Sequence, residues 1–159
     1  MNKYRLIIFD FDGTLADTFN AISSCLAKTF QRFHVVPPSQ EAVKSIIGLN
    51  LVDAFRLLNA PINGKTDLSI WIAIYRALYT QIGEIQTALF PGTKEILAFA
   101  KSSDLKLAVI SNKGTEAINS FLEMYGIRQL VSLVVGENNQ AIRKPDPMLF
   151  YSIIHWRYS

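Results

Sequence analysis

Near its start the chain reads Tyr4-Arg5-Leu6-Ile7-Ile8-Phe9-Asp10-Phe11-Asp12-Gly13-Thr14. The apolar part of this run has no helical period, which is typical of a short strand buried on both faces of a parallel sheet. Ligands of open α/β sheets bind at the carboxyl ends of such strands, where Asp10 and Asp12 fall. Gly13 is free to take a positive φ, so we expect a sharp turn whose N–H groups point at an anion such as phosphate.

A hairpin is the alternative interpretation, because Asp12-Gly13 is also a turn signal between two antiparallel strands. The residues that follow argue against it. Between Leu15 and Phe33 apolar side chains recur at helical spacing, at Ile22, Cys25, Leu26, Phe30 and Phe33. The pattern therefore favours a strand, a turn that carries carboxylates, and then a helix.

Composition limits the classes of protein that the chain can belong to. Of the 159 residues 50% are hydrophobic and 18% are charged, which is typical of a globular domain and excludes a disordered chain. The net charge is +3, but the 16 basic residues are spread out and only Arg143 and Lys144 are adjacent, so we expect no nucleic-acid partner. The apolar stretch 70–75 is too short to span a bilayer and no signal region precedes the first strand. We therefore expect no membrane association and a cytoplasmic location.

Four segments with helical spacing precede any second strand, at about residues 17–33, 40–48, 51–59 and 67–82, the last ended by Gly83. Helices and strands then alternate. Predicted strands cover 105–110, ended by Ser111-Asn112, and 131–135, and predicted helices cover about 93–101, 115–125 and 147–155. The alternation predicts an α/β fold, a Rossmann-like parallel sheet with flanking helices, into which the first four helices are inserted.

Some side chains in the predicted helices have two interpretations. In the fourth helix Trp71, Tyr75 and Leu78 recur at helical spacing. Core packing is the favoured interpretation of this stripe, and the lining of a ligand pocket is the alternative. Cys25, the only cysteine, is expected to pack in the core, and Asp17 is expected to cap the first helix without a chemical role.

Three short motifs together resemble the first three motifs of the haloacid-dehalogenase superfamily of phosphohydrolases, in the same order. They are Asp10-Phe11-Asp12-Gly13-Thr14, Ile110-Ser111-Asn112 and Lys144-Pro145-Asp146-Pro147. Ala16-Asp17-Thr18, Gly48-Leu49 and Phe90-Pro91-Gly92 look like the phosphoglycolate-phosphatase and β-phosphoglucomutase branch. The resemblance covers about residues 4–154. It implies a discontinuous core domain of residues 1–15 and 88–159, and a helical cap of residues 16–87.

The resemblance also implies roles for individual residues. Asp10 matches the nucleophile that forms an aspartyl phosphate, and Asp12 matches the general acid and base. The other matching positions are Lys144 as a catalytic cation, Gly13, Thr14, Ser111 and Asn112 as phosphate-binding positions, and the Asp10 carboxylate with the backbone carbonyl of Asp12 as magnesium ligands. The expected activity is that of a magnesium-dependent phosphatase that acts on a small phosphorylated metabolite.

The sequence departs from the family pattern after the third motif. The family's fourth motif is an acidic cluster, and the final residues Trp156-Arg157-Tyr158-Ser159 contain no carboxylate. Without the strand that carries that motif, the first strand would be an open edge. We therefore expect either a truncated form of a longer ancestor or a homodimer or partner complex formed through that edge. The alternative function is a catalytically impaired or silent protein that binds phosphate ligands or a protein partner.

Overall fold

The structure is a computed structural model that describes residues 5–137 and 142–158. Its centre is a three-stranded parallel sheet in the order β1-β4-β5, formed by Leu6–Phe9, Lys106–Gly114 and Leu133–Glu137. The carboxyl ends of parallel strands lie at one edge of a sheet. The polar residues that follow β1 and those at the end of β4 are therefore brought together, as the sequence predicted.

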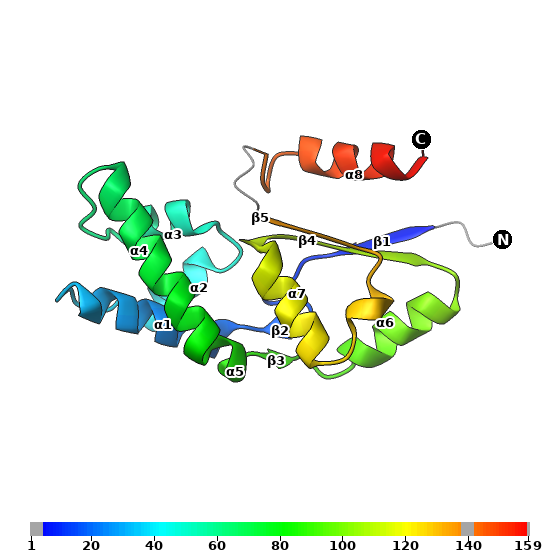
Figure 1. The fold of residues 1–159 in the computed structure, drawn as a ribbon, viewed down its shortest axis with the longest axis horizontal. Coiled ribbons are helices and arrows are strands. Elements are labelled where there is room, and N and C mark those ends of the chain that lie inside the picture. The colour runs from blue at the N-terminus through cyan, green and yellow to red at the C-terminus, as the bar shows by residue number, and fades with distance from the viewer. Residues whose placement is uncertain (1–4, 138–141, 159) are drawn as a thin grey trace.

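Helices cover both faces of this sheet (Figure 1). Helices α6 (Thr93–Ser102) and α7 (Thr115–Met124) lie on one face, and α8 (Met148–Tyr158) lies on the other. The short helix η2 (Arg128–Leu130) leads into β5. Buried aliphatic and aromatic side chains fill the space between the sheet and helices α6 and α7, among them Phe11, Leu107, Val109 and Phe121. The predicted α/β fold with flanking helices is confirmed.

The inserted helices form a second hydrophobic cluster of their own. We call residues 19–86 the cap; it contains α1 (Phe19–Arg32), α2 (Gln40–Ile46), α3 (Leu51–Leu57), α4 (Lys65–Leu78), the π-helix η1 (Tyr79–Gly83) and α5 (Glu84–Gln86). Trp71 packs edge-on against Phe30 and Phe55 and stacks on Phe33. Trp71 is buried in this cluster, and so is Cys25, as expected from their positions.

The cap joins the sheet domain through a pair of very short strands. Ala16 and Asp17 form β2, and Ala88 and Leu89 form β3. The two strands pair antiparallel, so the chain enters and leaves the cap at one place (Figure 1). We call this pair the stem. The exact division into a core of 1–15 and 88–159 and a cap of 16–87 stays a prediction.

The structure corrects several details of the expected elements. The strand expected at 4–9 is described from Leu6, and Tyr4 lies outside the described residues. The single helix expected at 67–82 is interrupted by the π-turn of η1. Strand β4 continues through Ser111 and Asn112 to Gly114. Asp17 lies in β2 and its Oδ1 accepts a hydrogen bond from Phe19 N at 3.2 Å, although Thr18 holds the cap position.

Strand β1 lies at one edge of the described sheet, next to β4 alone. Its four residues are half-buried. The edge is open within the part of the chain that the structure describes, as the sequence predicted. In the same residues no helix combines the length and the apolar composition that crossing a bilayer requires.

Candidate active site

The first aspartate of the opening motif sits directly after β1. Asp10 Oδ1 accepts a hydrogen bond from Phe11 N at 2.7 Å, and Lys144 Nζ lies 2.7 Å from the same oxygen. Both side chains are partly exposed. The structure thus brings together two residues that are 134 positions apart in sequence and that were both predicted to be catalytic.

The second aspartate has a different partner. Phe11, between the two aspartates, lies in a bend, and its ring is buried in the cluster between the sheet and helices α6 and α7. Asp12 forms an isolated bridge with Ala16. Its Oδ1 lies 3.3 Å from Lys113 Nζ. Each aspartate therefore has its own lysine.

A bulge in β4 brings Lys113 to this position. Ile110 pairs with Val135 and Gly114 pairs with Glu137, so five residues of β4 (110 to 114) lie opposite three of β5 (135 to 137). The extra residues bend the strand and re-aim its side chains. Gly136 lies against the bulge, because a Cβ at this position would come within 2.4 Å of Lys113 O. Only glycine fits that approach.

Lys113 is a buried cation between the sheet domain and the cap. Its side chain is 11% exposed and that of Asp12 is 7% exposed. Lys113 Nζ also lies 3.8 Å from the centre of the Tyr79 ring, which belongs to the cap. Burial on its own lowers the pKa of Lys113, but the Asp12 carboxylate and Tyr79 outweigh it and raise that pKa above 10.5. Lys113 is therefore charged at neutral pH. It connects its own strand β4 to Asp12, which follows β1, and to Tyr79 of the cap.

Asn112 makes a second connection between distant segments. Its Nδ2 donates to Gly48 O in the cap at 2.9 Å and to Lys144 O at 3.1 Å, and its Oδ1 accepts from Lys144 N at 3.0 Å. The amide thus orients the lysine that contacts Asp10. The buried Ser111 Oγ accepts from Lys113 N at 3.2 Å.

The two other predicted phosphate-binding positions have partners within their own loop. Gly13 has a φ of 75°, the turn conformation expected of it. Its N–H donates to Ala16 O at 2.9 Å, and Thr14 N donates to Phe11 O at 3.2 Å. These N–H groups are used to fold the turn rather than aimed at an open anion site. The phosphate-binding roles of Gly13, Thr14, Ser111 and Asn112 stay predictions.

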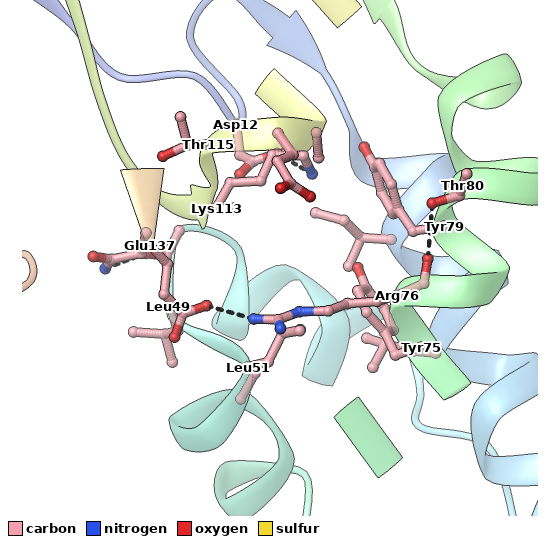
Figure 2. Close-up of a pocket in the computed structure, with 18 of the residues that line it drawn as sticks. Asp12, Leu49, Leu51, Tyr75, Arg76, Tyr79, Thr80, Lys113, Thr115 and Glu137 are labelled. Atoms are coloured by element: carbon pink, nitrogen blue, oxygen red, sulfur yellow. Dashed lines mark hydrogen bonds and ion pairs between the residues drawn. The ribbon is translucent and has the colours of Figure 1, made fainter. Parts of the chain in front are cut away.

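A cavity of about 560 Å³ lies where the cap meets the carboxyl ends of β4 and β5. Figure 2 shows Asp12 and Lys113 together on one part of its wall, with Tyr75, Arg76 and Tyr79 of the cap facing it. Burial raises the pKa of Tyr75 well above its ordinary value, so its hydroxyl stays neutral. Tyr75 packs in the cap and also lines the cavity. Core packing and pocket lining, the two interpretations of the apolar stripe of α4, therefore both apply to this residue.

Two further charged side chains line this cavity. Arg76 of α4 and Glu137 of β5 form an ion pair across it, with Nη2 and Oε2 3.3 Å apart. The sequence analysis singled out neither Lys113 nor Arg76. Lys113 follows Ser111 by two residues and so shares its side of a strand, which is a weak signal. The sequence around Arg76 carries no such signal, because the position of this side chain depends on how the cap packs against the sheet domain.

Asp10 and Asp12 are also the predicted magnesium ligands. The Asp10 carboxylate and the backbone carbonyl of Asp12 are hard oxygen donors of the kind that magnesium prefers, and one or two carboxylates often suffice when waters and a substrate phosphate complete the shell. The donor chemistry of this pair therefore fits magnesium. Within residues 5–137 and 142–158 no three His, Cys, Asp or Glu side chains gather into a metal-binding group. Both carboxylates have lysine partners.

Comparison with known proteins gives consistent matches. The family model for haloacid dehalogenase-like hydrolases matches residues 7–156. The chain is 28% identical over 159 residues to a phosphoglycolate phosphatase of Photobacterium profundum, covering 96% of this chain and 67% of that protein. It is 30% identical over 145 residues to the "Probable phosphatase IndB" of Dickeya dadantii, covering 89% and 63%.

The fold has a similar match among solved structures. The "Putative haloacid dehalogenase-like hydrolase" of Bacteroides fragilis superposes with a TM-score of 0.89 and 27% identity, over 99% of this chain and 75% of that one. The chain thus spans about two thirds of the length of the curated relatives that it matches.

Proposed function

The chain belongs to the haloacid dehalogenase-like hydrolase family, and from this premise we propose that it is a phosphatase that acts on a small phosphorylated metabolite through Asp10. The observation that carries this proposal is the contact of Lys144 Nζ with Asp10 Oδ1 at 2.7 Å. A cation beside the carboxylate nucleophile offsets the charge of an approaching phosphoryl group.

In the first step an Asp10 oxygen attacks phosphorus and the bond from phosphorus to the ester oxygen breaks. Lys144 and Phe11 N both contact Oδ1, so Oδ2 is the oxygen that attacks. The structure pairs Asp12 with Lys113 as a carboxylate, so Asp12 first takes up a proton from solvent. It then gives this proton to the leaving oxygen, and the alcohol departs. This division of one difficult displacement into two easier ones is the advantage of a covalent intermediate.

In the second step water attacks the phosphorus of the aspartyl phosphate. Asp12, now a carboxylate, accepts a proton from that water, and the bond from phosphorus to Asp10 breaks to release inorganic phosphate and restore both aspartates. Lys113 holds the Asp12 carboxylate in place between the two steps. Magnesium, held by Asp10 and the backbone carbonyl of Asp12, would supply charge stabilisation to the phosphoryl oxygens.

The test is turnover of p-nitrophenyl phosphate by the full chain with added magnesium. Asp10→Asn is expected to reduce hydrolysis to the background rate, because the amide is a poor nucleophile. Asp17→Asn is the matched control, since Asp17 is an exposed carboxylate on the stem whose Oδ1 accepts a hydrogen bond from Phe19 N. Absence of turnover by the folded chain, or equal loss in both variants, would contradict the proposal.

A second candidate is a silent protein that binds phosphate without hydrolysing it. The observation that favours it is that a lysine neutralises each aspartate while no group of three metal ligands gathers in the described residues. Its signature is binding of beryllium fluoride or inorganic phosphate, measured by calorimetry, by a folded chain that shows no hydrolysis. Asp10→Asn should weaken beryllium fluoride binding in either case.

Three finer points stay predictions of the proposed function. A substrate like that of the phosphoglycolate phosphatases is supported by the relatives' similarity alone. The cytoplasmic location rests on the sequence. A homodimer through the open edge of β1 is testable by sedimentation at increasing protein concentration, where a constant monomer mass would exclude it.

A further inference from the structure

We propose that the phosphorylated substrate is the ester of an uncharged alcohol with an apolar body, that the cap side of the cavity encloses this body, and that the Tyr75 hydroxyl hydrogen-bonds an oxygen on it. This inference rests on the proposed function, which places the phosphoryl group at Asp10 and the leaving oxygen at Asp12. The class departs from the two-carbon acid in the name of the phosphoglycolate phosphatases.

The two sides of the cavity differ in chemistry. The sheet domain contributes mostly polar side chains, among them Asp12, Asn112 and Lys113. The cap contributes aliphatic side chains from three helices and from the segment between α2 and α3. These are Ile22 and Leu26 of α1, Ile46 of α2, Leu49, and Leu51 and Ala54 of α3. An alcohol that extends from Asp12 toward the cap therefore meets apolar groups.

Burial places the apolar residues in the deep part of the cavity. Ile22, Leu26, Ile46 and Ala54 are at most 7% exposed although they line it. Arg76, a polar cap residue of the same lining, has a side chain that is 54% exposed and already paired. The cavity therefore enters the cap between α1, α2 and α3, and the cap's charged group lies toward solvent.

The volume of the cavity exceeds what a two-carbon acid fills. At about 560 Å³ it falls in the range of pockets that enclose most of a drug-sized ligand. Water is held poorly by an apolar wall, because a buried water needs several polar partners. An apolar body that displaces this water gains affinity in proportion to the surface it buries.

Tyr75 supplies a polar contact within the apolar side. The residue is 6% exposed and lines the cavity, and its hydroxyl has no hydrogen-bond partner among the residues that the structure describes. Buried tyrosine hydroxyls ordinarily have one. Figure 2 shows Tyr75 across the cavity from Asp12 and Lys113, so its hydroxyl is available to a ligand that reaches from one side to the other.

The surroundings of this hydroxyl favour an uncharged partner. Burial raises the pKa of Tyr75 well above its ordinary value, because the apolar wall disfavours a negative charge on the phenol oxygen. The same wall disfavours a carboxylate of the ligand at this point. A hydroxyl, ether or carbonyl oxygen satisfies the Tyr75 hydroxyl without that cost.

The first experiment compares two phosphonates that cannot be hydrolysed, ethylphosphonate and hexylphosphonate. Isothermal calorimetry on the full chain with magnesium is expected to show about tenfold tighter binding of hexylphosphonate, the gain from burying about two methylene groups. Ala54→Leu fills the apolar side and should remove most of this gain. Ala73→Leu is the matched control and should preserve it, since Ala73 is an exposed residue of α4 outside the cavity lining.

The second experiment tests the hydroxyl with Tyr75→Phe, which keeps the ring and removes no hydrogen bond within the described residues. The ligands are phosphonates that carry a terminal hydroxyl on alkyl chains of increasing length. The tightest of them is expected to lose about tenfold in affinity, while hexylphosphonate loses none. An equal loss for both ligands, or no loss for either, would overturn the contact with Tyr75.

The remaining outcomes separate this inference from the proposed function. Circular dichroism confirms that each variant is folded, and Leu51→Asn, at a half-buried position of the same wall, replaces Ala54→Leu if that variant is not. Binding of beryllium fluoride without a gain from ethylphosphonate to hexylphosphonate, or a gain that survives the substitution in the wall, would overturn the apolar substrate class alone. Failure of beryllium fluoride and of every phosphonate to bind would overturn the proposed function as well.

Discussion

Lys113 connects the sheet domain to the cap at the candidate site. It joins a carboxylate that follows β1 to an aromatic ring of the cap, and all three groups are nearly excluded from water. Breaking a buried pair by removing one partner leaves the other charge uncompensated, which costs far more than the intact pair contributes. The contact with Asp12 therefore limits both the residues that are tolerated at position 113 and the conformation of the site.

We expect Lys113→Met to lower the free energy of unfolding by about 3 kcal/mol, because the Asp12 carboxylate remains buried without a partner. Urea unfolding at pH 7 measures this. Arg56→Met is the control: its pair with Asp53 spans 3.8 Å with the arginine side chain 70% exposed, and its loss should change stability by less than about 0.5 kcal/mol. Equal effects of the two substitutions would show that the Lys113 pair is not held away from water.

Cys25 gives the protein a pH dependence at the alkaline end. Burial raises the pKa of its thiol from 9.0 to about 11, although the charges of Lys113 and Lys28 act in the opposite direction. The unfolded chain ionises first, so the contribution to stability is complete below pH 9 and is lost as the pH rises toward 11. We expect the free energy of unfolding to fall over this range, and to fall less steeply in Cys25→Ala. Identical pH slopes in urea unfolding would contradict this.

At the scale of elements, the bulge in β4 determines where the active-site side chains point. Glycine at position 136 of β5 leaves room for the bulged backbone of β4, since a Cβ there would come within 2.4 Å of Lys113 O. Without the extra residues, Lys113 would keep the alternation of a regular strand. The position of Lys113 in the cavity wall therefore depends on the absence of a side chain at Gly136 of the neighbouring strand β5.

Gly136→Ala is expected to destabilise the fold by about 2 kcal/mol or more, because the new methyl group would meet Lys113 O at 2.4 Å and Thr115 N at 2.6 Å. Gly114→Ala is the matched control on the facing strand. A Cβ there has nothing within 4 Å and the φ of −58° suits any residue, so its effect should stay within about 0.5 kcal/mol. Thermal unfolding of both variants tests the difference, and similar stabilities would exclude the close approach.

The elements that the sequence predicted are those with a long hydrophobic period. Helix α1, expected at 17–33, was found at Phe19–Arg32 within two residues of its predicted ends. The stem was missed because two-residue strands have no period to detect. The π-turn was missed because the spacing of apolar residues does not reveal it; within this turn Gly83 lies so close to the Tyr79 ring that a Cβ would meet it at 2.7 Å.

The candidate site was predictable to the extent that its residues belong to contiguous motifs. The resemblance to a family singled out both Asp10 and Lys144, and the structure brings these two residues into contact. Lys113 and Arg76 were not, because each is a single basic residue whose partner comes from a different part of the chain. Their roles arise only when the cap closes on the sheet.

At the scale of the whole molecule, several polar contacts tie the cap to the sheet domain. Besides the Lys113 and Arg76 contacts, Arg143 Nη2 lies 3.3 Å from Asp53 Oδ2 of α3. Asn112 connects Gly48 of the cap with Lys144. Because Asn112 contacts both segments, the position of the cap and that of the Lys144 backbone are coupled.

Asn112→Ala should loosen this connection. The Lys144 amide loses its acceptor at 3.0 Å, and we expect its hydrogen exchange to accelerate by about tenfold. Exchange measured by mass spectrometry over residues 142–150 reports it. Asn20→Ala, on an exposed position of α1, is the control and should leave exchange in that segment unchanged. An unaltered Lys144 amide in Asn112→Ala would show that its protection comes from elsewhere.

The geometry of the stem determines where the inserted helices could be exchanged in an engineered protein. Because Asp17 and Ala88 are paired neighbours, the ends of the inserted helices meet at one point of the sheet domain. Insertions whose ends lie close together are tolerated well by the host fold. The helical module is therefore a natural unit for grafting: a relative's module could be spliced in at these two residues, exchanging the wall that carries Arg76 while the aspartates and lysines beneath it remain in place.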